Sequence, residues 1–330
     1  MPRCRTGVLI LLAVLLVPAI CTAQELPSLY AIGSLNVGGV GIVPSLKVGY
    51  QSMAVNINVP VPFSGIFGLE LATASTLDFK LQDAGVWIGG VRVDARRGGL
   101  SLFVTAEGNA SKSARVSTQS DPFWAGFFPV YWRGSNLQWW SIDGGGAVDV
   151  SRDLAIIAGF KAEQLSLNLA DPIDPTGVIR QFQAQFGDRY SSDFLTKLWV
   201  PYFGLRVEGF NSTGTLIISP YTWANVTIPF RYLFIDTPFF GYEDARYNFN
   251  NGGVLLEGDI DYRVQAFANV GCTLWLKGTW CQIRGQGCEG YQGAVTNLGN
   301  IVASFSSQAS AAGSFSSYIL AGGLSFLYTF

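Results

Sequence analysis

The chain has 330 residues, of which 49% are hydrophobic and only 13% charged, and its formal net charge is −2. Soluble domains carry about 25% charged residues, so this composition excludes a disordered chain and argues against an ordinary cytosolic enzyme. The sequence contains no histidine, which excludes Ser-His-Asp and Cys-His catalysis and histidine-ligated zinc. Because no basic surface is indicated, we expect no nucleic-acid partner.

Residues 1–23 have the order of a secretory signal peptide. Arg3 and Arg5 precede an apolar run over residues 8–20, and small residues follow up to Ala23. This run is too short to cross about 30 Å of hydrocarbon as a helix. The pattern predicts export with cleavage after Ala23. Lipidation of Cys21 is the alternative, and the isoleucine before it is a poor fit to that signal.

Residues 24–46 are glycine-rich and mildly apolar. We interpret them as an N-terminal periplasmic segment that forms a tether, a plug or two additional strands. The remaining chain, residues 47–330, is predicted to form one β-barrel domain.

Four parts of the chain repeat one pattern, in which apolar and charged residues alternate ahead of a short turn. They are residues 90–95, 147–150, 205–209 and 257–262, with turns near 97, 152, 212 and 263–266. Strict alternation is typical of strands with two different faces. In a soluble sandwich the charged face would meet water, whereas in a membrane barrel it lines the interior.

The charged face supplies the candidate lumen-lining residues. These are Arg92, Asp94, Asp149, Lys161, Glu163, Arg206, Glu208, Glu257, Asp259 and Asp261. Oppositely charged members at matching heights can pair across a barrel interior, where an unpaired charge would be costly.

The lengths of the connections favour the membrane barrel. The four short turns alternate with long segments, whereas soluble sandwiches place turns about every 8–12 residues. We predict an antiparallel up-and-down barrel of about ten strands, with twelve as the alternative. The ten strands are expected at about 47–60, 83–95, 100–110, 137–150, 154–167, 197–209, 214–227, 253–262, 267–280 and 317–330.

Aromatic residues cluster where these strands are expected to leave the bilayer. The clusters are Phe123-Trp124, Tyr131-Trp132, Trp139-Trp140, Tyr221 with Trp223, and Trp275 with Trp280. We interpret them as an interfacial aromatic girdle, with a platform for stacking a ligand as the alternative.

The C-terminus places large apolar residues on one face of a final strand. They are Leu324, Phe326, Tyr328 and Phe330. This ending resembles the last strand of Gram-negative outer-membrane β-barrel proteins. The resemblance implies a transmembrane barrel in the outer membrane, contact with lipid and lipopolysaccharide, and recognition of the C-terminal strand by the barrel-assembly machinery.

Three cysteines remain after the predicted cleavage, Cys272, Cys281 and Cys288. An odd number allows one internal disulfide, and we predict a loop disulfide between Cys281 and Cys288. The sequence has no CxxC spacing and no nucleotide-binding fingerprint, so no metal or cofactor is expected.

The sequence leaves two functions open. Barrel enzymes of this compartment, as families, rely on histidine, so we expect no enzymatic activity. The remaining alternative is an aspartyl site that uses either Asp143 and Asp149 or the row Glu257, Asp259 and Asp261. The leading hypothesis is a narrow, porin-like channel for small solutes. The alternative is a closed barrel that serves as a structural or adhesive surface protein and binds a partner or lipopolysaccharide through aromatic loops. The oligomeric state is left open.

Overall fold

The computed structural model describes residues 35–61, 75–110, 116–120, 130–173, 189–228, 230–233, 240–242, 245–249, 252–267, 270–297 and 300–328. The predicted signal peptide and residues 24–34 lie outside the described residues. Within these ranges the regular structure is all β, and no helix is long and apolar enough to cross a membrane.

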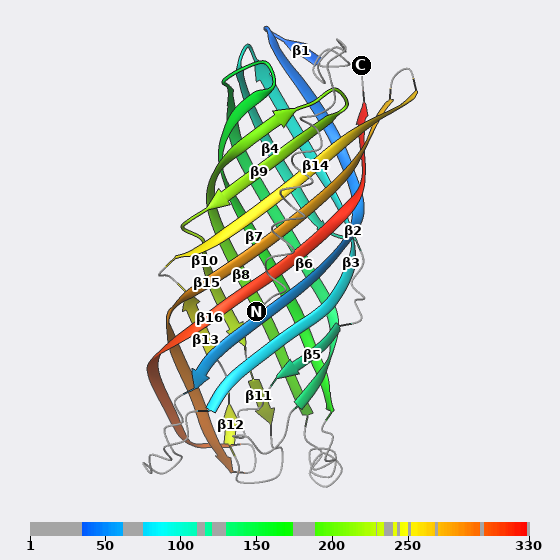
Figure 1. The fold of residues 1–330 in the computed structure, drawn as a ribbon. Helices are drawn as coiled ribbons and strands as arrows, with labels where there is room; N and C mark the ends of the chain where they lie inside the picture. Colours follow the sequence, from blue (N-terminus) through cyan, green and yellow to red (C-terminus); the bar gives the residue numbers. More distant parts are fainter. Residues whose placement is uncertain are drawn as a thin grey trace, which may run out of the picture.

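Ten long strands form a closed antiparallel barrel (Figure 1). They are β2 (Val40–Val61), β3 (Ser75–Arg97), β4 (Leu100–Asn109), β6 (Val130–Asp149), β7 (Leu154–Ile173), β8 (Arg189–Glu208), β9 (Ser212–Ser219), β14 (Gly253–Phe267), β15 (Val270–Asn297) and β16 (Asn300–Tyr328). The ring closes because β2 pairs with β3 on one side and with β16 on the other. The predicted ten-stranded barrel is therefore confirmed.

Six shorter strands complete the structure. They are β1 (Leu35–Val37), β5 (Val116–Ser120), β10 (Trp223–Ile228), β11 (Phe230–Leu233), β12 (Phe240–Tyr242) and β13 (Ala245–Phe249). β5 lies between β3 and β6, in line with β4, while β10 pairs with both β8 and β13. Apart from β1, which pairs with the start of β2, these strands continue the wall of the barrel beyond the ends of β4, β9 and β14.

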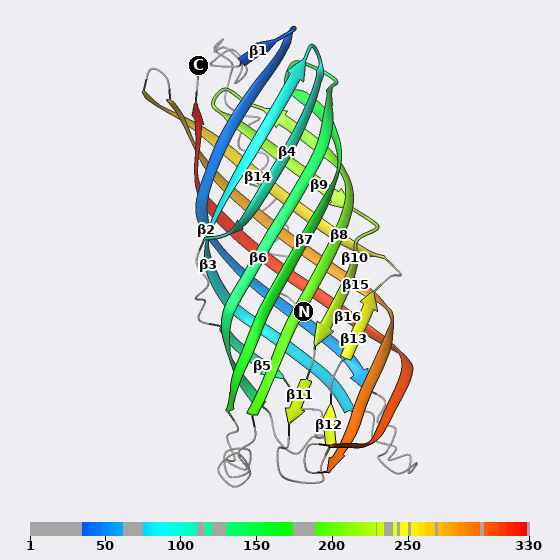
Figure 2. The same cartoon turned by 180° about the vertical axis from the view of Figure 1, so that it is seen from behind.

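The two ends of the barrel differ. One end, at the top of Figure 1, holds the turns at 98–99, 150–153 and 209–211, together with β1 and the end of β16; we call it the turn end. The opposite end holds β5, β11 and β12 (Figures 1 and 2), and we call it the loop end. Short turns at one end and longer connections at the other match the asymmetry of outer-membrane barrels.

The first barrel strand begins at Val40, earlier than the predicted Lys47. Residues 35–37 fold back on 40–42 as a hairpin, with φ of 59° at Gly38 and 82° at Gly39. Glycine suits this two-residue turn because both central positions need positive φ. Residues 40–46 therefore belong to the barrel wall and not to a separate periplasmic segment.

Strand ends also depart from the prediction elsewhere. The turn expected at 263–266 is absent, because β14 continues to Phe267 and β15 begins at Val270. β15 and β16 pair with each other along almost their whole length, from Val270↔Tyr328 to Asn297↔Asn300. β15 therefore extends beyond its predicted end near 280, and β16 begins before its predicted start near 317.

The outward face of the barrel is apolar. Among its exposed side chains are Leu46, Val48, Trp87, Val91, Val93, Leu102, Val104, Ile142, Ile156, Phe203, Leu205, Leu274, Leu276, Leu320 and Phe326. Their inward-facing neighbours in sequence include charged and hydroxyl side chains. This apolar-out, polar-in alternation is the arrangement that a lipid-facing barrel requires.

Candidate functional site

All ten predicted lumen charges lie on inward-facing positions of the barrel. Arg92, for example, lies between Val91 and Val93, which are 50% and 44% exposed on the outer face. Lys161, Glu163, Arg206 and Glu257 are buried, and the other six are partly buried. The interior is therefore the candidate functional site.

Six charged side chains form a continuous chain of ion pairs across the lumen. We call it the ionic crossbar, and in order it consists of Glu163, Lys161, Glu257, Lys277, Glu107 and Lys47. Lys161 Nζ lies 2.7 Å from Glu257 Oε2 and 3.4 Å from Glu163 Oε2. Positive and negative charges alternate along it, so every charged group has at least one opposite neighbour.

The crossbar continues from Glu257 toward the other wall of the barrel. Lys277 Nζ lies 3.4 Å from Glu257 Oε1 and 4.0 Å from Glu107 Oε2. Glu107 is in turn 3.5 Å from Lys47 Nζ. Because β15 and β4 are separated by β16, β2 and β3 in the ring, the Lys277–Glu107 contact connects distant parts of the wall.

Three of these six residues, Lys47, Glu107 and Lys277, were not among the predicted lumen charges. Lys47 alternates with Leu46 and Val48, which are exposed on the outer face, so the same period-two pattern carried the signal. Each of these three residues has no other charged residue close to it on its strand. No alternating row of charges therefore indicated that its side of the strand lines the lumen.

A second set of ion pairs lies nearer the turn end. Arg92 donates two hydrogen bonds to Asp94, of 2.8 and 2.9 Å, in a bidentate arrangement. Arg96 donates to Asp149 at 2.5 Å. Arg206 lies between Asp149 and Glu208, at 3.6 and 3.4 Å.

Asp259 and Asp261 differ from the other lumen charges. Among the residues that the structure describes, neither has an ion-pair partner within 4.0 Å. Asp261 lines a pocket at the turn end, which we call the rim pocket. Its charged lining consists of Lys47, Arg92, Asp94, Arg206, Glu208 and Asp261, and its other lining residues include Thr213, Thr215 and Thr273.

The structure does not bring Asp143 and Asp149 together. Both lie on β6, six residues apart, which corresponds to roughly 20 Å along a strand. Asp143 accepts a 2.6 Å hydrogen bond from the hydroxyl of Tyr202, whereas Asp149 pairs with Arg96 at the turn end. Asp143 and Asp149 therefore do not form a paired-carboxylate site with each other.

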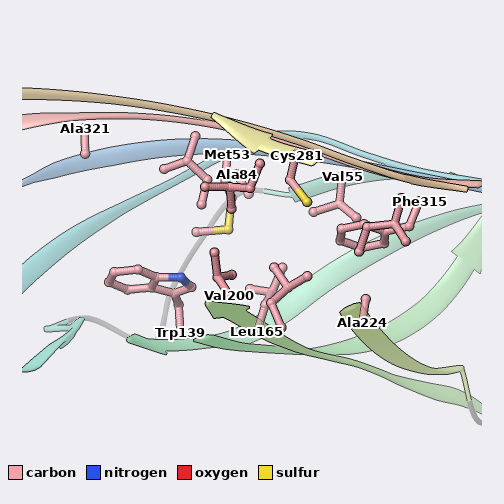
Figure 3. Close-up of a cluster of buried hydrophobic side chains, with 14 of the residues drawn as sticks. Met53, Val55, Ala84, Trp139, Leu165, Val200, Ala224, Cys281, Phe315 and Ala321 are labelled. Atoms are coloured by element: carbon pink, nitrogen blue, oxygen red, sulfur yellow. The ribbon is translucent and has the colours of Figure 1, made fainter. Parts of the chain in front are cut away.

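Apolar side chains fill the lumen on the loop-end side of the crossbar. We call this set the apolar cluster: Met53, Val55, Ile57, Leu81, Ala84, Leu137, Trp139, Leu165, Leu167, Phe194, Leu198, Val200, Ala224, Phe249, Cys281, Ile283 and Phe315, each at most 5% exposed. They come from strands all round the ring. Figure 3 shows members from facing walls pointing toward one another.

Two tryptophans predicted for the aromatic girdle lie inside the barrel instead. Trp139 and Trp275 are 3% and 5% exposed and face the lumen. Trp140 and Tyr221 are exposed, as a girdle requires. Side-chain direction alternates along a strand, so of the adjacent pair Trp139-Trp140 only one member can face lipid. Residues 121–129, which include Phe123 and Trp124, lie outside the described residues.

The predicted disulfide is not formed. Cys281 carries a free, buried thiol, and Cys288 lies seven residues further along the same strand. Two Cα atoms seven residues apart in a strand are about 23 Å from each other, whereas a disulfide needs less than about 7 Å. In the described part of the chain, no group of three or more cysteine or acidic side chains is arranged to hold a metal ion.

Comparisons with known proteins agree with the fold. No protein-family model and no curated protein match the chain. Among solved structures, the outer-membrane protease OmpT from Escherichia coli aligns with a TM-score of 0.57 at 15% identity, covering 90% of this chain and 99% of OmpT.

Two further similar structures are the translocator domain of the autotransporter NalP from Neisseria meningitidis and the toluene transporter TodX from P. putida. Their TM-scores are 0.37 and 0.32, at 7% and 10% identity. They cover 90% and 87% of this chain, and 90% of each of those chains is covered. At 15% identity the similarity to OmpT shows the fold alone. The chain therefore has the fold of an outer-membrane β-barrel.

Proposed function

We propose that the protein is a closed β-barrel of the bacterial outer membrane that serves as a scaffold for the extracellular loops between its strands. The observation that carries this proposal is the apolar cluster. Its side chains come from β2, β3, β6, β7, β8, β10, β13, β15 and β16, so they fill the cross-section from every side. Porin barrels of 16–18 strands leave an aqueous channel, whereas the interior of a barrel of about eight strands is just wide enough for its own side chains to fill.

The outward apolar face supports placement in a bilayer. Each arginine or lysine at the midplane of a barrel's lipid face would cost about 2–4 kcal/mol. The large side chains exposed on the outer face are aliphatic or aromatic, among them Val48, Trp87 and Leu320. Outer-membrane lipid and lipopolysaccharide are thus the surroundings we propose, with the turn end in the periplasm.

The last strand supports assembly by the usual outer-membrane route. Leu324 and Phe326 are exposed on the outer face of β16, which closes the ring against β2. Phe330 lies outside the described residues. We propose that this strand is the segment that the barrel-assembly machinery recognises, and that deletion of residues 324–330 reduces the amount of folded protein in the outer membrane. A deletion variant that assembles as well as the full chain would contradict this role.

Passage of small solutes is the second candidate function. It is favoured by the polar half of the lumen, where the rim pocket lies between charged side chains. In this case the apolar cluster would have to rearrange to open a path.

Single-channel recording in a planar bilayer separates the two candidates. Heat-modifiable gel migration serves as the control that the refolded barrel has formed. The closed scaffold predicts no discrete conductance steps from folded protein. Discrete, salt-dependent steps would contradict it and favour the channel, in which case Asp259→Asn is expected to change ion selectivity without impairing assembly.

Accessibility on intact cells tests the orientation. An epitope inserted within residues 121–129, between β5 and β6, is expected to bind antibody on intact cells. The same epitope at the 98–99 turn is expected to bind antibody only after the outer membrane is permeabilised. The reverse pattern would contradict the placement of the loop end outside the cell.

A further inference from the structure

The rim pocket contains polar groups whose hydrogen-bonding capacity is not used. Arg206 is only 6% exposed, yet its side-chain contacts among the described residues are long: 3.4 Å to Glu208, 3.6 Å to Asp149 and 3.5 Å to the Ser101 hydroxyl. Hydrogen bonds between arginine and a carboxylate are typically about 2.7–2.9 Å. The Arg206 Nε atom has no hydrogen-bond partner.

Arg92, on another strand that lines the same pocket, differs from Arg206 because its hydrogen bonds are short. Its two bonds to Asp94 are 2.8 and 2.9 Å long. A buried charged donor without a good acceptor is destabilising, so the long contacts of Arg206 need an explanation. An additional acceptor in the pocket would provide one.

An acceptor and a hydroxyl with spare capacity lie on the neighbouring strands. Asp261 has no ion-pair partner within 4.0 Å among the described residues. Its backbone partner on β9 is Thr213, whose Oγ1 atom is buried without a hydrogen bond. The pocket thus presents an underused cationic donor, an unpaired carboxylate and a free hydroxyl.

Strand register fixes how these groups are arranged. Two neighbouring rows cross β8, β9 and β14: Glu208–Thr213–Asp261 and Arg206–Thr215–Asp259. Adjacent strands are about 4.8 Å apart, so β8 and β14 are separated by about 10 Å. The threonines between them are short, which leaves space between an arginine on one side and carboxylates on the other.

We propose that the rim pocket binds a small zwitterion of the size of an α-amino acid. The ligand carboxylate accepts from Arg206, its ammonium group donates to Asp261, and the Thr213 hydroxyl completes the contacts. The charged lining has three basic and three acidic residues, so its formal charge is zero. A lining of this kind matches a zwitterion better than a simple anion or cation.

The position of the pocket gives the ligand access from the periplasm. Glu208 is the last residue of β8, and Thr213 is the second residue of β9, so the site lies beside the 209–211 turn. On the other side, the crossbar and the apolar cluster separate it from the loop end. The binding proposed here is independent of whether the barrel conducts.

Isothermal titration of the refolded barrel in detergent tests this inference, with glycine as the probe. Acetate and methylammonium, each carrying one of the two charges, are titrated at the same ionic strength. We expect saturable glycine binding with a Kd of about 1 mM and at least tenfold weaker binding of either single-charge compound. No saturable glycine binding, or equal binding of acetate, would overturn the proposal.

Variants link the binding to the pocket. Asp261→Asn and Thr213→Val remove two of the contacts and leave the Arg96–Asp149 and Arg92–Asp94 pairs in place, and each is expected to weaken glycine binding about tenfold. Asp153→Asn, in the exposed 151–153 turn, is the control and is expected to bind glycine like the wild type. Heat-modifiable migration verifies folding of each variant. Unchanged binding by folded Asp261→Asn and Thr213→Val would place the site elsewhere.

Discussion

The Nζ atom of Lys161 on β7 lies 2.7 Å from Oε2 of Glu257 on β14, although β8 and β9 separate these strands in the ring. Thr279 donates a second hydrogen bond, of 2.9 Å, to the same carboxylate oxygen. Both charges are almost fully buried, at 1% and 5% exposed. The pair therefore links parts of the wall that backbone hydrogen bonds do not connect.

Removing the cation of this pair is expected to destabilise the barrel strongly. Lys161→Met leaves Glu257 and Glu163 buried beside an apolar side chain, and breaking a buried pair costs about 3–5 kcal/mol. The measurement is the free energy of unfolding in urea, in detergent or lipid. The double variant Lys161→Met with Glu257→Gln is expected to recover part of the loss, because no carboxylate then remains at position 257.

The control for this prediction is Asp153→Asn in the exposed turn between β6 and β7. Surface substitutions of this kind change stability by about 0.5 kcal/mol or less. A Lys161→Met variant that unfolds like this control would show that the crossbar does not hold the walls together.

A close approach between Gly159 and Tyr202 provides a second prediction. A Cβ atom at position 159 would collide with the Tyr202 phenol and come within 2.7 Å of the Gly144 carbonyl oxygen. Gly159→Ala is therefore expected to lower the free energy of unfolding by about 1–3 kcal/mol. At Gly108 the nearest atom to such a Cβ is 3.4 Å away, so Gly108→Ala is the matched control and is expected to be tolerated. Equal stability of the two variants would contradict the packing.

The fold could be predicted from the sequence because strand alternation is local. A period of two assigns each side chain to one face, so the row from Arg92 to Asp261 identified both the strands and the lumen. The ends of β15 and β16 could not be predicted in this way. Their outer parts, 284–297 and 300–313, are rich in glycine, serine and glutamine and show no apolar–polar alternation, yet the two segments pair with each other.

The contacts within the site could not be predicted, because they depend on strands that are distant in sequence. Lys161 and Glu257 are 96 residues apart, and only the register of the closed barrel brings them to the same height. The same holds for the rim pocket, where Arg206, Thr213 and Asp261 come from three strands. The predicted disulfide failed for a related reason, since Cys281 and Cys288 were assumed to flank a loop and instead lie within one strand.

The cost of placing a charge on the lipid-facing surface is expected to depend on its depth in the bilayer. Leu320 is 60% exposed near the middle of the barrel part of β16, whereas Val150 is 59% exposed beside the turn that follows β6. Leu320→Arg is expected to destabilise the barrel in a bilayer by about 2–4 kcal/mol, and Val150→Arg by about 0–1 kcal/mol. Unfolding in lipid vesicles measures both. Equal costs would contradict a membrane belt centred on the middle of the barrel.

The two described thiols are expected to differ in reactivity. Cys281 is fully buried in the apolar cluster and Cys272 is partly exposed on β15. In the folded barrel, a small maleimide in excess is expected to leave Cys281 unmodified. Heating in SDS is expected to make Cys281 reactive, because the maleimide can reach this thiol only when the barrel opens. Peptide mass spectrometry after labelling, without reductant, locates the modified cysteines. Recovery of a Cys281–Cys288 disulfide-linked peptide from the folded protein would contradict the register of β15, since those residues are separated by seven positions of one strand.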